Sequence, residues 1–332
     1  MSELAIIGAG GWGTALAIVL APRFARVRLW VYEADLAQRL AATRQNDLYL
    51  PGFTLPDNVA PTTDLAFAVR QAAIVLSAVP SHHVRAIYRR MLPHLAPEQV
   101  FASATKGLEN GTLLRMTEVI AETLSGRFAP RVAALSGPTF AREVARGEPT
   151  ALVVASTDAE LAASLQTAFS GPAFRLYTSA DPVGVETGGA VKNVVAIGAG
   201  VLHGLGLGSN AMAALITRGL AEMTRLAVAL GAEPRTLAGL AGLGDLVLTC
   251  TGELSRNRGV GVELAKGRNL AEIVASMRMV AEGIKTTEAA VDLARRHGVD
   301  LPIATQMLQM LHFGVSPREA IRKLMDRALK GE

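Results

Sequence analysis

Short apolar runs alternate with amphipathic stretches over about the first 180 residues of this chain. Apolar runs bounded by turn residues predict buried strands, and the longer stretches between them predict helices. Strands that alternate with helices build a parallel sheet with helices on both faces. The runs that we interpret as strands are Glu3–Ile7, Val27–Tyr32, Ile74–Ala78, Val100–Ala104, Val132–Ser136 and Ala151–Ala155.

The pattern changes near Tyr177–Pro182, and from Asp181 onward we find helical patterns and no strand. The stretches that we interpret as helices there are Val183–Leu205, Ala211–Leu230, Leu270–Met279, Thr286–Arg296 and Pro302–Phe313. The first of these contains several glycines, which lower helix stability, so tertiary packing must hold it. The sequence therefore predicts a doubly wound, mostly parallel α/β domain over residues 1–180 and an all-α domain over residues 181–332.

A glycine-rich turn, Gly8-Ala9-Gly10-Gly11-Trp12-Gly13, directly follows the first strand and opens a helical run. Gly8 permits a sharp turn, Gly10 leaves room for a phosphate, and Gly13 lets the helix pack closely on the strand. Glu33 ends the second strand, twenty residues after Gly13, where an acid binds a ribose 2′-hydroxyl. The glycines alone are also compatible with a purely structural turn. Strand, turn, helix and acid together favour a Rossmann-type nicotinamide or flavin site.

Composition and charge restrict the function classes. Hydrophobic residues make up 50% of the chain and charged residues 19%, which is typical of a folded globular enzyme. No apolar run reaches the ~18 residues of a membrane span without a charge or glycine, and we expect no cleaved leader. The net charge of +4 is spread along the chain, so we expect no nucleic-acid partner. The single cysteine, Cys250, favours a reducing cytoplasm, and no HExxH or CxxC pattern indicates a metal.

Several polar residues follow the predicted strands, where open α/β sheets bind ligands. Lys106 comes after one strand, and Gly137 and Thr139 come after another. In the helical half, Lys192-Asn193 lies within the glycine-rich apolar helix, where we expect Gly188 and Gly189 to leave open space above the amine. A lysine in such a helix needs a partner or a function. The residues alone leave open whether Lys192 is an acid–base catalyst or pairs structurally with a buried acid.

A second polar group contains Asp245 and Thr249, followed by the Ser255-Arg256-Asn257 turn before a helical stretch. The guanidinium of Arg256 can form two bonds to a phosphate, although an isolated arginine is also compatible with a surface charge. Cys250 is interpreted as a small buried residue rather than a nucleophile. His82 and His83 have no neighbours in the sequence that would complete a metal site or a catalytic triad.

Taken together and in order, these segments resemble the bacterial type of NAD(P)-dependent glycerol-3-phosphate dehydrogenase from Ile6 to about Arg327. The ordered series is far more specific than any one motif. Besides the opening glycine turn, the matching segments are Tyr49–Gly52, Ala78–Ser81, Ala104–Gly107, Ser136–Ala141, Gly188–Gly200, Ala213–Gly219, Gly242–Gly252 and Ser255–Arg258.

The resemblance implies that Lys192 is the general acid–base in the interconversion of dihydroxyacetone phosphate and glycerol 3-phosphate, with Thr249 orienting Lys192 or Asp245. It implies a substrate site made of Lys106, Gly137, Thr139, Lys192, Asn193, Asp245, Ser255, Arg256 and Asn257. Besides Gly8, Gly10, Gly13 and Glu33, it implies cofactor contacts from Gly11, Trp12, Tyr32, Tyr49, Lys106, Ala141, Arg256, Val280 and Glu282. It further implies NAD(H) or NADP(H) as cofactor, a small phosphorylated triose as substrate, a cytoplasmic homodimer, and supply of glycerol phosphate for phospholipid synthesis.

The segment Tyr32-Glu33-Ala34-Asp35 departs from what a 2′-phosphate needs, because acids stand where a cation would bind it. We therefore expect NAD(H) to be used at least as well as NADP(H). We also expect burial and nearby cations to lower the pKa of Lys192 toward neutrality. Two other functions stay open at this point. One is a related β-hydroxyacid or ketopantoate reductase, which the Ser255–Asn257 turn disfavours, and the other is a nucleotide-sensing protein without turnover.

Overall fold

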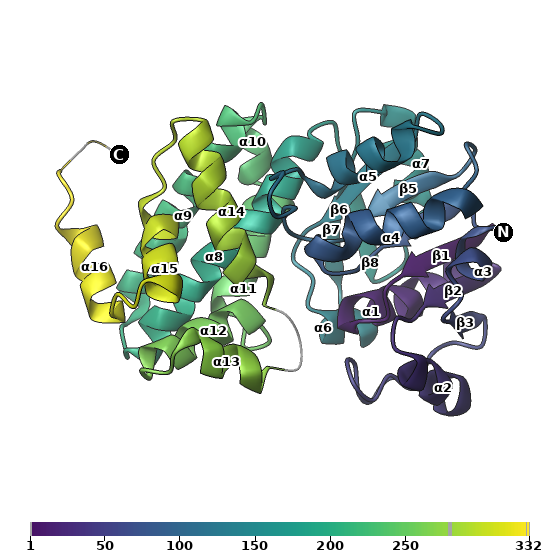
Figure 1. Cartoon of the computed structure of the whole chain (residues 1–332), viewed down its shortest axis with the longest axis horizontal. Helices are drawn as coiled ribbons and strands as arrows, with labels where there is room; N and C mark the ends of the chain where they lie inside the picture. The colour runs from purple at the N-terminus through teal and green to yellow at the C-terminus, as the bar shows by residue number, and fades with distance from the viewer. Residues whose placement is uncertain (1, 278–280, 330, 332) are drawn as a thin grey trace. The chain divides into compact units, whose positions relative to one another are not determined.

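The computed structural model describes residues 2–277, 281–329 and 331. The chain divides into two compact units. Unit 1 comprises Met1–Glu109 and Leu114–Glu186, and unit 2 comprises Asn110–Leu113 and Thr187–Glu332. In Figure 1 the sheet of unit 1 runs from purple to teal, and the helices of unit 2 run from teal to yellow.

Unit 1 contains an eight-stranded sheet in the order β3-β2-β1-β4-β5-β6-β7-β8 (Figure 1). Neighbouring strands among the described residues are parallel, except for the antiparallel pair β6 and β7. The strands are β1 Glu3–Ile7, β2 Arg26–Trp30, β3 Val59–Thr62, β4 Ile74–Ser77, β5 Val100–Ser103, β6 Arg131–Ser136, β7 Thr150–Ala155 and β8 Phe174–Ser179. The mostly parallel α/β prediction and its six strands are confirmed, with ends shifted by one or two residues. β3 and β8, which are the two edge strands, were not predicted from the sequence.

The sheet carries a hydrophobic core on each face. Successive residues of a strand point to opposite faces, so Ile6 and Ile7 of β1 are both fully buried but belong to different cores. Helices α1, α2, α6 and α7 contribute to the first core, and α3, α4 and α5 contribute to the second. The helices of unit 1 are α1 Gly11–Leu20, α2 Ala34–Thr43, α3 Leu65–Val69, α4 Val84–Met91, α5 Met116–Ser125, α6 Ala141–Ala145 and α7 Ala159–Phe169.

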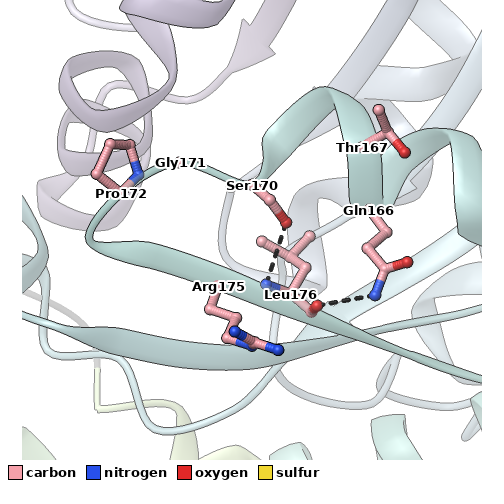
Figure 2. A pocket seen from close by; sticks show the side chains of 7 residues that line it. All are labelled: Gln166, Thr167, Ser170, Gly171, Pro172, Arg175 and Leu176. Carbon is pink, nitrogen blue, oxygen red and sulfur yellow. Dashed lines mark hydrogen bonds between the residues drawn. The ribbon is translucent and has the colours of Figure 1, made fainter.

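The outer edge of β8 is occupied by the chain that precedes it. Phe174 exchanges two backbone hydrogen bonds with Gly171, at 2.8 and 3.2 Å. Figure 2 shows that the Ser170 hydroxyl accepts from the Leu176 N–H at 3.3 Å and that the Gln166 amide donates to the Leu176 carbonyl at 2.9 Å. The turn between α7 and β8 therefore satisfies backbone groups that an edge strand otherwise leaves open.

Unit 2 is helical, and its described residues contain no strand. Its long apolar helix α8 (Pro182–Gly204) begins in unit 1 and continues into unit 2. The other elements are α9 Ser209–Ala229, α10 Pro234–Leu237, the π-helical turn η4 Leu240–Gly244, α11 Asp245–Thr251, α12 Arg256–Ala265, α13 Leu270–Ser276, α14 Glu282–Arg296, α15 Pro302–His312 and α16 Pro317–Met325. The predicted helix ending at Met279 stops at Ser276, and Met279 lies outside the described residues. Among the described helices, none alone has the length and apolar composition to cross a membrane.

Glycines allow α8 and α12 to cross at backbone contact. A Cβ atom on Gly200 of α8 would lie 1.9 Å from the carbonyl oxygen of Arg258. A Cβ atom on Gly261 of α12 would lie 1.9 Å from the carbonyl oxygen of Ile197. Any side chain at either position would separate the helices, so this crossing explains why a glycine-rich segment forms a stable buried helix.

Candidate active site

The glycine turn has the geometry of a phosphate-binding loop. Gly8 has a φ of +114°, which favours glycine, and a Cβ atom on Gly13 would lie 1.8 Å from the Gly8 carbonyl oxygen. A Cβ atom on Gly10, in contrast, would have no described heavy atom within 4 Å. Because α1 begins at Gly11, its first N–H groups and helix dipole are presented beside this open position. The turn therefore fits the pyrophosphate of a dinucleotide.

Four predicted cofactor residues lie in this turn or against it. A Cβ atom on Gly11 would lie 2.9 Å from the Tyr49 carbonyl oxygen and 3.9 Å from the Ala141 methyl group. The Trp12 indole donates to the carbonyl oxygen of Ala104, at the end of β5, at 3.2 Å. Gly11, Trp12, Tyr49 and Ala141 are thus gathered in one region, although they are widely spaced in the sequence.

The end of β2 presents an aromatic residue and an acid. Tyr32 is 73% exposed, and Glu33, which is half-buried, precedes the first turn of α2. The Tyr49 hydroxyl donates to the Glu33 carboxylate at 2.7 Å. Burial, followed by the bond to Glu33, raises the pKa of Tyr49 to about 12, so the phenol stays a neutral donor at physiological pH. The arrangement fits a ribose that hydrogen-bonds to a carboxylate.

Lys106, Gly137 and Thr139 come together beyond the ends of β5 and β6. The Lys106 amine donates to the Gly137 carbonyl at 2.8 Å and lies 3.2 Å from the Thr139 hydroxyl. Gly137 has a φ of +149°, and a Cβ atom there would lie 2.8 Å from Leu152 Cα in β7. This half of the predicted substrate site therefore places a cation at the carboxyl edge of the sheet, where an anionic substrate can be bound.

In unit 2, Lys192 is buried together with an acid and a hydroxyl. Its side chain is 6% exposed, and the Lys192 amine forms a buried ion pair with Asp245, at the first residue of α11. The amine also donates to the Thr249 hydroxyl at 2.9 Å, and this hydroxyl donates to the Asp245 carbonyl at 2.6 Å. The Thr249 hydroxyl therefore accepts a hydrogen bond from the Lys192 amine and donates its own proton to the backbone of α11.

Gly188 has a different role from the one expected. A Cβ atom on Gly188 would lie 2.7 Å from the Ala241 carbonyl oxygen and 3.2 Å from Leu237 Cδ1. Instead of leaving open space above the Lys192 amine, Gly188 admits the π-helical turn η4, which leads directly into Asp245. The expectation of open space was wrong because the sequence does not show which segment packs against that helix face.

A chain of amides joins three helices next to Lys192. The Asn257 side chain donates to the Asn193 side-chain carbonyl at 3.0 Å and accepts from the Gly283 N–H at 2.9 Å. Ser255 caps α12 by accepting from the Arg258 N–H at 3.2 Å, and Arg256 is exposed at the first residue of α12. Glu282 opens α14, whereas the predicted cofactor residue Val280 lies outside the described residues.

Two buried polar clusters were not found from the sequence. Asn46 is fully buried against the glycine turn. Glu186, in α8, accepts from the Thr117 N–H at 2.9 Å and from Arg115 at 2.8 Å, and burial raises the pKa of Glu186 although Arg115 opposes this. Their partners are tens of residues away in the chain, so no local pattern reveals them. Within the described residues, no cluster of three or more His, Cys, Asp or Glu side chains could hold a metal.

The chain matches known proteins over its whole length. Residues 3–162 match the family model for the N-terminus of NAD-dependent glycerol-3-phosphate dehydrogenase, and residues 181–322 match that for its C-terminus. A relative from Koribacter versatilis, glycerol-3-phosphate dehydrogenase [NAD(P)+], is 60% identical over 98% of both chains. The crystal structure of glycerol-3-phosphate dehydrogenase from Coxiella burnetii is 41% identical, with a TM-score of 0.93 over 98% of this chain and 99% of that one. The chain therefore belongs to the NAD-dependent glycerol-3-phosphate dehydrogenase family.

Proposed function

We propose that Lys192 is the general acid–base of this enzyme. The chain is an oxidoreductase that interconverts dihydroxyacetone phosphate and sn-glycerol 3-phosphate with NAD(H) or NADP(H). The observation that carries the proposal is the buried group of Lys192, Asp245 and Thr249. A nucleotide-sensing protein would not require a buried, oriented ammonium of this kind. Family membership also decides against the β-hydroxyacid and ketopantoate reductases.

The chemistry requires a proton at the C2 oxygen of the substrate. A bound reduced nicotinamide supplies the hydride that converts the C2 carbonyl into an alcohol. Lys192 donates a proton to the developing oxyanion and takes it back in the oxidative direction, a contribution typically worth ~10²–10⁴-fold. Asp245 supplies the opposite charge that allows an ammonium in a buried site, and Thr249 fixes its direction.

The phosphate group of the substrate is a dianion that takes no part in bond breaking, but the protein needs a cationic group to bind it. We assign this role to Arg256 and to the N-terminus of α12, which Ser255 caps. Asn257 donates one N–H to Asn193 and accepts from the Gly283 N–H, so it holds Asn193 in position beside Lys192. We propose that its second N–H adds a hydrogen bond to the phosphate. In unit 1, Lys106, Gly137 and Thr139 are the residues that we propose for substrate binding.

The proposed cofactor site is built on the glycine turn and the end of β2. Its residues are Gly8, Gly10, Gly11, Trp12, Gly13, Tyr32, Glu33, Tyr49, Lys106, Ala141, Arg256, Val280 and Glu282. In this scheme residues 1–180 supply most of the dinucleotide contacts, and residues 181–332 supply the catalytic group together with Arg256, Val280 and Glu282. We further propose that the protein is cytoplasmic and forms a homodimer, because two-fold dimers are the commonest soluble oligomers. Light scattering tests the dimer by measuring the molar mass in solution.

The decisive experiment compares Lys192→Ala with Lys266→Ala, a control at an exposed lysine. Oxidation of NADH by dihydroxyacetone phosphate, followed by absorbance, should show a kcat lower by about 10²–10⁴-fold in Lys192→Ala and an unchanged kcat in the control. NADH binding, measured without substrate, should be unaltered in both. Normal turnover by Lys192→Ala would remove the catalytic assignment.

The phosphate assignment has its own test. Arg256→Ala should raise the KM for dihydroxyacetone phosphate by roughly tenfold or more, because a charge-assisted pair is lost. With NADH at saturation, so that the proposed contact of Arg256 with the cofactor does not limit the rate, the same variant should lose much less activity on unphosphorylated dihydroxyacetone. Equal losses on the two substrates would show that Arg256 does not recognise the phosphate.

A further inference from the structure

Asn46, in the loop between α2 and β3, fastens that loop to the glycine turn. Its side chain is fully buried, and its amide donates to the carbonyl oxygen of Ala9 and to the hydroxyl of Thr14, both at 2.8 Å. Its side-chain carbonyl accepts from the Tyr49 N–H at 2.9 Å. Both N–H groups and the carbonyl of this one side chain are therefore used, and the backbone of Tyr49 is tied to the middle of the turn.

Tyr49 then carries the connection to the end of β2. Its backbone carbonyl approaches Gly11 so closely that a Cβ atom there would lie 2.9 Å away. Its hydroxyl donates to Glu33 Oε1 at 2.7 Å. A continuous set of contacts thus runs from Ala9 through Asn46 and Tyr49 to Glu33. It joins the part of the turn that fits the pyrophosphate to the acid that fits the ribose.

The charges around Glu33 oppose a second phosphate. Asp35 and Asp47 both bond to the guanidinium of Arg39, at 2.8 and 3.2 Å, so the positive charge of Arg39 faces two carboxylates. The Arg39 hydrogen bond also holds the pKa of Asp35 below its usual value, which keeps this carboxyl charged. Glu33, two residues before Asp35, adds a third carboxylate beside the start of α2, against which a 2′-phosphate would have to bind.

We propose that Asn46 and Tyr49 are positioning residues that hold the Glu33 carboxylate in place and thereby set a preference for NAD(H) over NADP(H). The inference rests on the proposed dinucleotide site of unit 1. With Oε1 held by the phenol, Oε2 keeps a fixed direction in which it can accept from ribose hydroxyls. A 2′-phosphate would then meet a fixed carboxylate. Without the phenol, Glu33 can rotate into solvent and the phosphate is tolerated.

The test is direct cofactor binding in the absence of substrate, by titration calorimetry with NADH and with NADPH. Tyr49→Phe removes only the hydroxyl and keeps the ring. It should lower the ratio of the NADPH to the NADH dissociation constant by between about twofold and tenfold, which is less than a full hydrogen bond to a charged group contributes, because the phenol acts on the cofactor only through Glu33. Glu33→Gln, which removes the charge itself, should lower the ratio at least as much. Tyr177→Phe, on the exposed face of β8, is the matched control and should not change it.

Asn46→Asp examines the first link, because an aspartate can still accept from the Tyr49 N–H but cannot donate to Ala9. It should weaken binding of both cofactors and lower the ratio as well. If this variant does not fold, Tyr49→Phe decides the question alone. An unchanged ratio in Tyr49→Phe, or a wild-type preference for NADPH, would overturn the inference. A wild-type protein that binds neither cofactor would instead overturn the proposed function.

Discussion

Glu222 of α9 is a buried carboxylate that caps another helix. It is 4% exposed and accepts from the N–H groups of Ile303 and Ala304, at 2.7 and 3.2 Å. These are the first N–H groups of α15 after Pro302, which has none. Two effects compete at this site. Burial disfavours the charged form, whereas the two N–H groups and the helix dipole favour it.

Burial prevails and raises the pKa of Glu222 to about 7, from an ordinary value of 4.5. The native state therefore binds this proton more tightly than the unfolded state does. The resulting stabilisation is fully present below pH 4.5 and is lost as the pH rises through 7. At ~1.4 kcal/mol for each pKa unit, the loss between pH 5 and pH 8 amounts to about 2 to 3 kcal/mol.

Glu222→Gln removes the titration while nearly preserving the shape. At pH 5 the variant should be less stable by about 1 kcal/mol, because one of the two N–H groups then faces an amide NH2 group. Between pH 5 and pH 8 the stability of the variant relative to wild type should rise by about 2 to 3 kcal/mol. At pH 8 the variant should therefore be the more stable protein.

Urea unfolding followed by circular dichroism at pH 5, 6, 7 and 8 measures the difference. Hydrogen exchange of peptides covering α15 provides a second readout that is local to unit 2. Glu253→Gln, at an exposed position, is the control and should show no such trend. A difference independent of pH would mean that the N–H groups offset burial completely. If the variant instead became less stable than wild type as the pH rises, the N-terminus of α15 would favour the charged carboxylate more than burial disfavours it, and the reasoning would be refuted.

Three further predictions follow from close contacts and burial. Gly261→Ala would place a Cβ atom 1.9 Å from the Ile197 carbonyl oxygen and should lower the free energy of unfolding, measured with urea, by about 3 kcal/mol or more. Gly259→Ala is the control on the same helix: its Cβ atom would have no described atom within 4 Å, so it should raise that free energy by about 0.5–1 kcal/mol. Gly10→Ala should leave the melting temperature unchanged but weaken NADH binding roughly tenfold in calorimetry, since only the phosphate needs that space. Burial raises the pKa of Cys250 to about 12, so Ellman's reagent at pH 8 should label it only after unfolding.

The layered arrangement of the first unit could be predicted because its central strands are buried on both faces. Such strands are nearly continuous apolar runs, as in Ile74–Ser77, and are visible in one sequence. The two edge strands differ. Val59–Thr62 is short and contains Pro61, and Phe174–Ser179 alternates buried and exposed residues. Neither gives a continuous apolar run, so both were missed.

The candidate site shows the same division. The glycine turn and the acid after β2 follow local spacing rules, so the sequence alone predicts a cofactor role for them. Residue chemistry alone did not show that Lys192 pairs with Asp245, because the two residues are 53 positions apart and come together only in the folded chain. The two acceptors of the Asn46 amide, in Ala9 and Thr14, lie 37 and 32 positions away in the chain, and the sequence around them does not indicate a buried amide. Such contacts depend on which distant residues a loop meets when it folds back, and the hydrophobic pattern of the sequence does not show this.

The two protected edges of the sheet have a consequence for how the protein behaves in a crowded cell. At β8, Gln166, Ser170 and Gly171 already occupy the backbone groups through which a foreign strand would attach. At the opposite rim, Pro61 removes an N–H group from β3. Neither border offers an uninterrupted row of donors and acceptors, so an eight-stranded sheet can persist at high concentration without recruiting neighbours into fibrous aggregates.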